Sequence, residues 1–381
     1  MKIRGGGMLR NIVLICMVFS TLGGVFAGSE PTGAARTAME ELLVSPELLE
    51  RGALDMCWQV SLPLKEREQI DRIYVFEKYV YVLTNSNYLF CIDKEKKAVR
   101  FGLELAIRGL PVGEPLHHKG DLWFMVGNEL RIVSPKTKKI EKRKPVRALG
   151  RGAVGAMVRN KERLYVLAND KRLHSLVIEG FWQDFMVAAA DGSRINSVVA
   201  DNRFLVVTTE AGNVISIYPN QAKRRWQYDV VGEIAAPLVR QGEWLYVGSR
   251  NSKLYKINIR NGRTAWDEAF HAGGELKKPP MLGARVVYQS TDDKGVYAID
   301  KETGRMVWQA PRGVDVLVEV GVRAYVFAEP GVLVVMDNAE ARRLYSVNFA
   351  NVKKYAVNTV DKAIYVADLN GRVMCIAEKS R

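Results

Sequence analysis

Short apolar segments alternate with polar turns along this chain, and the pattern recurs about every 40 residues from Tyr81 to the C-terminus. Each copy contains an apolar strand, a hairpin turn, a second apolar strand, a charged turn and, in many copies, a tryptophan. With the middle of the first apolar strand as reference, the copies lie at Tyr81, Trp123, Tyr165, Leu205, Tyr246, Val287, Tyr325 and Tyr365, at intervals of 42, 42, 40, 41, 41, 38 and 40 residues. A sequence period of this length is typical of a repeat architecture.

The fifth copy shows how one repeat is organised. Residues 243–248 form a short apolar run that ends at a glycine, 253–258 alternate, and 261–262 form a turn. Alternation with a period of two, bounded by Gly, Asn, Asp and Ser, predicts strands and hairpins. A further strand upstream, at 234–239, brings the number to four. Four antiparallel strands per repeat predict one blade of a β-propeller.

Eight copies therefore predict an all-β fold, an eight-bladed β-propeller of four-stranded antiparallel blades. In the eighth copy the tryptophan position falls beyond Arg381, so this blade lacks its outer strand. Residues 56–61, ahead of the first repeat, have the missing pattern and include Trp58. We expect this N-terminal strand to complete the last blade, because a closed ring leaves no open strand edge. The predicted propeller spans residues 56–381 as one cooperative domain.

The sixth copy resembles the motif A-x-D-x-x-T-G-x-x-x-W of the PQQ-like repeat family. In copies two and three, Lys142 and Phe185 stand where the tryptophan belongs. The resemblance implies that the glycine and tryptophan residues dock neighbouring blades. The expected structural residues are Trp58, Trp226, Gly262, Trp266, Ala298, Asp300, Thr303, Gly304 and Trp308.

The length, the blade count and the N-terminal segment also resemble the BamB family of propellers, which act in outer-membrane β-barrel assembly. The resemblance implies a non-catalytic scaffold for protein–protein interaction that carries no cofactor. Its partner would be a protein of the cell envelope, and the residues do not identify it.

The N-terminus has the features of an export signal. Three basic residues precede the apolar run 12–19, and 25–27 fit a small-residue cleavage site. We expect a signal peptide at 1–27, cleaved after Ala27, an N-terminal extension at 28–55, and a periplasmic or outer-envelope location. Cys16 does not fit a lipoprotein signal, because Ile15 precedes it where a small residue is required.

The net charge of +14 is unevenly distributed, with many basic residues in the turn between the third and fourth strands of a blade. The densest group is Lys136, Lys138, Lys139, Lys142, Arg143 and Lys144. One interpretation is a solvated, twisted outer strand. The other is a surface that attracts anionic headgroups, polysaccharide or an acidic partner. We expect no nucleic-acid partner, because the protein is exported and aromatic stacking motifs do not accompany the charge.

Motifs for catalysis are absent from the sequence: it contains no G-x-S-x-G, H-E-x-x-H, C-x-x-C or phosphate-binding loop. The four histidines are scattered and lack metal-ligand spacing. We therefore expect no enzyme activity and no bound metal. A glycan- or ligand-binding propeller that uses an exposed aromatic such as Trp182 is the alternative. A PQQ-dependent dehydrogenase is disfavoured, because such enzymes typically carry an adjacent Cys-Cys pair that this chain lacks.

Three cysteines follow the expected cleavage site, which permits at most one internal disulfide. Cys91 and Cys375 both occupy the small inward position of the motif on neighbouring blades. Blade spacing places such residues too far apart for a disulfide, so we expect buried thiols.

Overall fold

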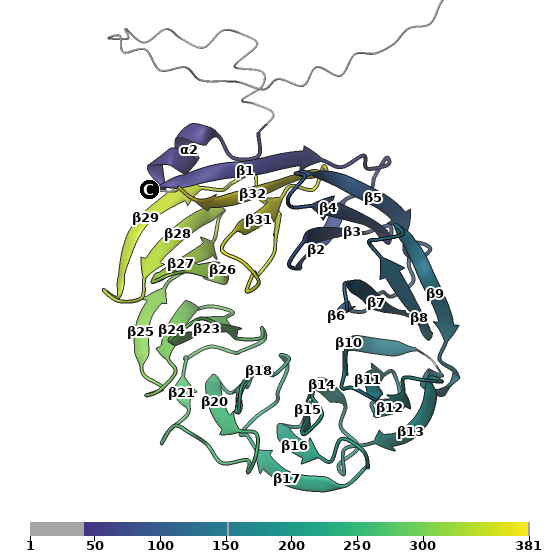
Figure 1. Ribbon diagram of the computed structural model, residues 1–381. Coiled ribbons are helices and arrows are strands. Elements are labelled where there is room, and N and C mark those ends of the chain that lie inside the picture. The colour runs from purple at the N-terminus through teal and green to yellow at the C-terminus, as the bar shows by residue number, and fades with distance from the viewer. Residues whose placement is uncertain (1–41, 151, 380–381) are drawn as a thin grey trace, which may run out of the picture. The chain divides into compact units, whose positions relative to one another are not determined.

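Eight four-stranded antiparallel sheets are arranged radially in the unit that begins at Leu42 (Figure 1). The computed structural model describes residues 42–150 and 152–379. The sequence-based prediction of an all-β, eight-bladed propeller is confirmed. The expected signal peptide, 1–27, lies outside the described residues.

The blades follow one another along the chain, and in blades 1 to 7 the strands run in sequence order from the inside of the ring outwards. Blade 1 consists of β2 (Ile70–Val75), β3 (Tyr79–Thr84), β4 (Tyr88–Asp93) and β5 (Ala98–Glu104); blade 2 of β6 (Leu116–His118), β7 (Asp121–Val126), β8 (Glu129–Ser134) and β9 (Lys139–Pro145); blade 3 of β10 (Ala153–Arg159), β11 (Arg163–Ala168), β12 (Leu173–Val177) and β13 (Trp182–Val187). Blade 4 consists of β14 (Ile195–Ala200), β15 (Leu205–Thr209), β16 (Asn213–Ile217) and β17 (Arg224–Asp229); blade 5 of β18 (Val239–Gln241), β19 (Trp244–Gly248), β20 (Lys253–Asn258) and β21 (Phe270–His271); blade 6 of β22 (Met281–Leu282), β23 (Val286–Thr291), β24 (Gly295–Asp300) and β25 (Met306–Ala310). Blade 7 consists of β26 (Gly313–Val320), β27 (Arg323–Ala328), β28 (Val332–Asp337) and β29 (Arg342–Asn348); blade 8 of β30 (Lys354–Tyr355), β31 (Ile364–Ala367), β32 (Arg372–Glu378) and β1 (Leu54–Ser61). A short 3-10 helix, η1 (Arg147–Leu149), follows blade 2.

The ring is closed by its first strand. β1 pairs antiparallel with β32 and forms the outer strand of blade 8. Trp58 lies opposite Cys375, and a β-bulge interrupts the register between Met56 and Trp58. The predicted completion of the last blade by the N-terminal strand is therefore confirmed.

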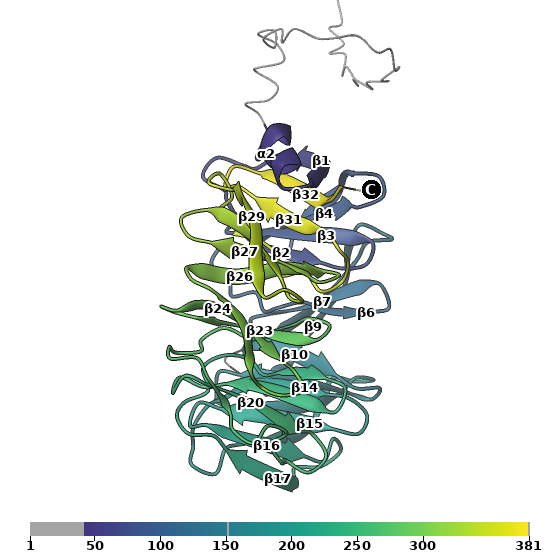
Figure 2. The same cartoon turned by 90° about the vertical axis from the view of Figure 1, so that its left-hand side faces the viewer.

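A short helix precedes the closing strand. α2 (Pro46–Arg51) begins after Ser45, with proline in its first turn, and lies beside β1 in both views of the ring (Figures 1 and 2). Leu43, Val44 and Leu49 are almost fully buried, in a cluster with residues of blades 7 and 8. These residues fall within the 28–55 segment that the sequence assigned to an extension. Among the described residues, no helix has the length and apolarity needed to cross a membrane.

The second and third strands of each blade are buried on both faces, as in β3 and β4. Register shows which residues are equivalent between blades. Tyr81 lies opposite Cys91 in blade 1, and the same position is taken by Val206 in blade 4 and Tyr288 in blade 6. The sequence-based references Leu205 and Val287 are thus one residue off. Because both faces of these strands are apolar, alternation along the sequence could not fix the register.

Candidate functional site

Three consecutive blade interfaces are joined by a tryptophan that reaches into the next blade. Each indole nitrogen donates a hydrogen bond to a residue just after the third strand of that blade. Trp226 donates to the Ile259 carbonyl oxygen at 3.0 Å, Trp266 to the Lys301 carbonyl oxygen at 2.9 Å, and Trp308 to Asn338 Oδ1 at 2.8 Å. These contacts link blades 4 to 5, 5 to 6 and 6 to 7.

A glycine receives the indole ring at two of these interfaces. Gly262 and Gly304 have φ angles of +73° and +72°, and a Cβ atom on either would lie 2.7 Å from the ring of Trp226 or Trp266. Positive φ favours glycine, and the close ring leaves no space for a side chain. The geometry explains why a glycine stands at this position of the motif.

The remaining motif residues of the sixth copy shape the turn that receives Trp266. Asp300 Oδ1 accepts hydrogen bonds from the backbone N–H groups of Glu302 and Thr303, at 3.0 and 2.7 Å, and from the Thr303 hydroxyl, at 2.9 Å. The hydrogen bond from the Thr303 backbone is the main cause that lowers the pKa of Asp300. Ala298 is fully buried opposite Trp308.

Trp58 occupies the corresponding position in blade 8. It is 6% exposed, and its ring centroid lies 6.1 Å from that of Tyr365. The expected structural residues thus all lie in turns or strands at blade interfaces, and we propose that they dock the blades.

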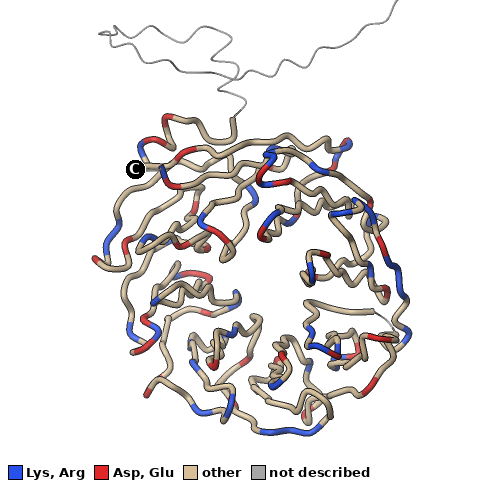
Figure 3. Tube along the Cα trace, in the orientation of Figure 1, with Lys and Arg blue, Asp and Glu red and all other residues tan. Residues whose placement is uncertain are grey.

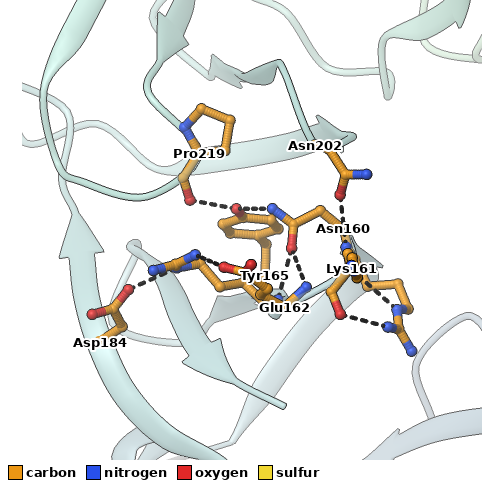
Figure 4. A network of polar contacts seen from close by, with 9 residues as sticks. Asn160, Lys161, Glu162, Tyr165, Asp184, Asn202 and Pro219 are labelled. Carbon is orange, nitrogen blue, oxygen red and sulfur yellow. Dashed lines mark hydrogen bonds and ion pairs between the residues drawn. The ribbon is translucent and has the colours of Figure 1, made fainter. Parts of the chain in front are cut away.

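The interface between blades 3 and 4 lacks the tryptophan, because Phe185 lies at that position, opposite Ser175. Polar contacts connect these blades instead (Figure 4). The Tyr165 hydroxyl donates to the Pro219 carbonyl oxygen at 2.5 Å and accepts from Asn160 Nδ2 at 2.9 Å. The Lys161 N–H donates to Asn202 Oδ1 at 2.9 Å.

The interface between blades 2 and 3 has lost both halves of the motif. Lys142 lies opposite Ile132, where Trp308 lies opposite Ala298 in blade 6. Phe181 takes the glycine position: its N–H donates to the Val177 carbonyl oxygen, as Gly304 donates to Asp300. Its φ angle of +57° is positive, like those of Gly262 and Gly304.

A cleft of about 870 Å³ opens at this interface, which we call the blade 2–3 cleft. Its principal lining residues are Trp123, Lys142, Lys144, Arg159, Ile178 and Phe181. The cleft lies on the face formed by the turns between strands one and two and between strands three and four of each blade. It occupies the region that a docked tryptophan would fill in a complete motif.

Cations and aromatic rings are paired inside the blade 2–3 cleft. Lys144 Nζ lies 5.1 Å from the ring centroid of Phe181, and the Arg159 guanidinium carbon lies 5.4 Å from that of Trp123. The Trp123 and Phe181 rings are 6.2 Å apart. Burial and the nearby charge of Arg159 lower the pKa of His118, whose ring contacts Trp123 edge-on. This lining suits a ligand that carries both an anionic group and an apolar group.

Acidic residues also reach the blade 2–3 cleft. Asp121, Glu141 and Glu179 are part of its wall. The charge inside the cleft is therefore mixed. The excess of positive charge lies along β9, the outer strand of blade 2.

The six basic residues singled out from the sequence, here called the basic rim, are Lys136, Lys138, Lys139, Lys142, Arg143 and Lys144. The first two lie in the turn before β9 and the others in β9 itself, which carries a run of blue at the edge of the ring in Figure 3. Five are exposed and Lys144 is half-buried. Lys142 and Lys144 reach the blade 2–3 cleft, whereas alternation along the strand turns Arg143 away from it.

Sequence reasoning found the basic rim but missed Trp123, Arg159 and Phe181 as its partners. Trp123 lies in the apolar second strand of its blade and is 8% exposed, so its sequence context does not distinguish it from a core residue. The available signal was the spacing of Phe181, four residues after the end of the third strand, where copies five and six have Gly262 and Gly304. Within residues 42–150 and 152–379, no group of three His, Cys, Asp or Glu side chains is arranged to hold a metal ion.

Comparison with known proteins identifies one family. The family model described as outer membrane protein assembly factor BamB matches residues 109–310 and 179–380. Among solved structures, BamB from Moraxella catarrhalis is similar with a TM-score of 0.66 and 16% identity, over 86% of this chain and 98% of that chain. The computationally designed Ika8 protein is similar with a TM-score of 0.64 and 12% identity, over 83% and 98%. At these identities the structural likeness establishes the fold alone. No curated protein matches the sequence.

Proposed function

Because the chain belongs to the family of the outer membrane protein assembly factor BamB, we propose that it is a non-catalytic scaffold of the cell envelope. In this role it binds a protein partner during the assembly of outer-membrane proteins. The export signal expected at 1–27 supports a propeller that works in the periplasm or at the outer envelope. Because one fold hosts many functions, family membership supports only the general role. The choice of partner must come from the residues on the surface of the propeller.

The observation that carries the proposal is the open blade 2–3 interface. Where Trp226 and Trp266 fill the equivalent space at other interfaces, here Lys142 leaves a cleft bordered by Trp123 and Phe181. Buried aromatic side chains beside cations are the usual anchors of protein interfaces. We assign the partner contact to this cleft and to the basic rim next to it.

The charge of the outer strand indicates the chemistry of the partner. Residues 136–147 contain seven basic residues and one acidic residue, Glu141. Such a field attracts and orients an anionic surface before contact. The partner segment that fits is acidic and carries an apolar side chain able to pack between the rings of Trp123 and Phe181.

Recognition would proceed through side chains. β9 is the outer strand of its blade, and its lysines discourage backbone pairing with another strand. A partner strand added to the edge of β9 would lie along Lys142 and Lys144 and would leave the cleft unfilled. A partner segment that enters the blade 2–3 cleft instead forms ion pairs with both lysines.

Site-directed photocrosslinking in cells tests the proposal. A photoreactive amino acid replaces Lys142 in one variant and Gln227 in another; Gln227 is exposed on β17, the outer strand of blade 4. We expect the probe at 142 to capture the central β-barrel assembly protein of the same envelope, and the probe at 227 to capture little of it. Equal capture at both positions, or capture at 227 alone, would contradict the assignment.

A second candidate function rests on a single exposed aromatic residue. Trp182, at the start of β13, is 56% exposed, and exposed tryptophans often stack on sugar rings. Binding of envelope polysaccharide that is lost in Trp182→Ala and retained in Lys142→Ala would favour a glycan-binding propeller over the scaffold.

A further inference from the structure

Two cysteines meet where the first and last strands of the propeller pair. In this pairing Met56 lies opposite Ile376 and Trp58 opposite Cys375, so one residue of β1 is additional. That residue is Cys57. In a β-bulge the two residues of the bulged strand face the same residue of the partner strand. Cys57 and Trp58 therefore both face Cys375.

The packing agrees with the register. Cys375 is 3% exposed, in an apolar cluster that includes Trp58 and Tyr365, and Cys57 packs against the same cluster. The two thiols are close enough that each shifts the pKa of the other. Cα atoms of directly opposed residues on adjacent antiparallel strands are about 4.5–5.5 Å apart, within the range that disulfides span.

The two thiols differ in accessibility and acidity. Cys57 is half-buried; its hydrogen bond with Cys375 and the positive charge of Lys97 lower the pKa of its thiol, against the effect of burial. The same hydrogen bond, together with burial, raises the pKa of Cys375. A partly exposed thiolate beside a buried, protonated thiol is the arrangement of an attacking and a resolving cysteine.

We propose that Cys57 and Cys375 are a redox site whose disulfide covalently closes the propeller ring. The pair joins the outer strand of blade 8 to the strand beside it, at the single seam where the two ends of the ring meet. This inference is independent of the proposed scaffold function, because it concerns closure of the fold and not the partner.

The reaction requires an external disulfide as oxidant, either a small molecule such as oxidised glutathione or a disulfide-bearing oxidoreductase. The Cys57 thiolate attacks one sulfur of that disulfide, forms a mixed disulfide and releases one thiolate. The Cys375 thiol loses its proton and attacks Cys57 Sγ, which releases the second thiolate. Two protein thiols are thus oxidised to one disulfide, and the external disulfide is reduced to two thiols.

Cys91 provides the internal comparison. It lies in blade 1, fully buried, and its strand partner is Tyr81 and not another cysteine. Burial raises the pKa of Cys91, which makes it a poor nucleophile. We expect this thiol to stay reduced while the other two react.

The test uses the full chain carrying Cys16→Ser, purified reduced and then treated with oxidised glutathione. Digestion without reductant and mass spectrometry should recover a peptide pair linked through residues 57 and 375. The melting temperature should rise by about 5 °C on oxidation, because the link constrains almost the whole unfolded chain. The rise should persist in Cys91→Ala and vanish in Cys57→Ser and Cys375→Ala.

Both variants of the pair are expected to fold. Cys375→Ala places at this position the residue that blade 6 has, Ala298, and Cys57 is half-buried. If one variant fails to fold, the other still reports on the pair. The proposal is overturned if the oxidised native chain yields no 57–375 peptide, if glutathione remains on Cys57, or if Cys57 is linked to Cys91.

Discussion

The indole ring of Trp266 covers Gly304 of the next blade so closely that a Cβ atom on the glycine would lie 2.7 Å from the ring. The same relationship holds between Trp226 and Gly262 one blade earlier. The repeat motif therefore describes a contact whose two halves come from different repeats. At the blade 2–3 interface both halves are replaced, by Lys142 and Phe181, and this contact is absent.

Gly304→Ala should lower the free energy of unfolding by more than Gly192→Ala does. Both glycines have a φ angle of +72°, so an alanine at either site carries the same backbone strain, about 1 kcal/mol. At Gly192 no atom lies within 4 Å of the added Cβ, whereas at Gly304 the ring of Trp266 must move. Overpacking adds about 1–3 kcal/mol. Denaturant unfolding measures the difference, and equal losses would argue against the docking role.

Restoring the motif at the blade 2–3 interface should close the cleft. In the double variant Lys142→Trp and Phe181→Gly, the new indole is placed to donate to the carbonyl oxygen of Ile178, which follows the third strand of blade 3 as Lys301 follows that of blade 6. We expect unchanged or higher thermal stability and a loss of partner capture, here measured by co-purification because the crosslinking position 142 is itself changed. Arg143→Trp is the control, since it removes a charge on the same strand and leaves the cleft open; loss of capture in this control would point to charge alone.

Neutralising the basic rim should weaken partner binding in a manner that depends on salt. Exposed charges are screened over about 10 Å at 0.1 M salt, so binding of the unaltered protein should fall steeply as salt rises. Replacing Lys138, Lys139, Lys142, Arg143 and Lys144 by glutamine should flatten that dependence and change the melting temperature little. A control variant replaces the three exposed basic residues Lys223, Arg224 and Arg225 in blade 4. Should both variants bind alike, the rim would be an ordinary solvated strand.

Asp300 should contribute stability that depends on pH. Hydrogen bonds from Thr303 lower the pKa of the folded carboxyl below its usual value. A carboxyl with a lowered folded pKa stabilises the protein above its unfolded pKa, about 4, and that contribution is lost as the pH falls through the folded pKa. Asp300→Asn should therefore be less stable than the unaltered protein at pH 7, with a difference that narrows below about pH 4. Urea unfolding at several pH values measures this; a difference that stays constant would exclude the carboxylate as its source.

The fold could be predicted because each of the eight repeats has the same local pattern of strands and turns. Period-two alternation, turns such as Asn261–Gly262 and the spacing to Trp266 specify a blade within one repeat. The closing strand was also predictable, since Trp58 supplies the one element that the eighth copy lacks. The basic rim was visible for the same reason, because its six residues are neighbours in the chain.

Apart from the closing strand, the residue pattern did not specify which residues of different repeats meet. Two apolar faces on the middle strands left the register of Leu205 and Val287 undetermined by one residue. The blade 2–3 cleft exists because Lys142 and Phe181, in separate repeats, both depart from the motif at one interface. Cys57 and Cys375 lie near opposite ends of the propeller sequence, and a single bulge in the pairing of β1 with β32 turns them toward each other. Local periodicity determines strands and blades, whereas contacts between blades depend on side-chain packing and register, which only the closed ring decides.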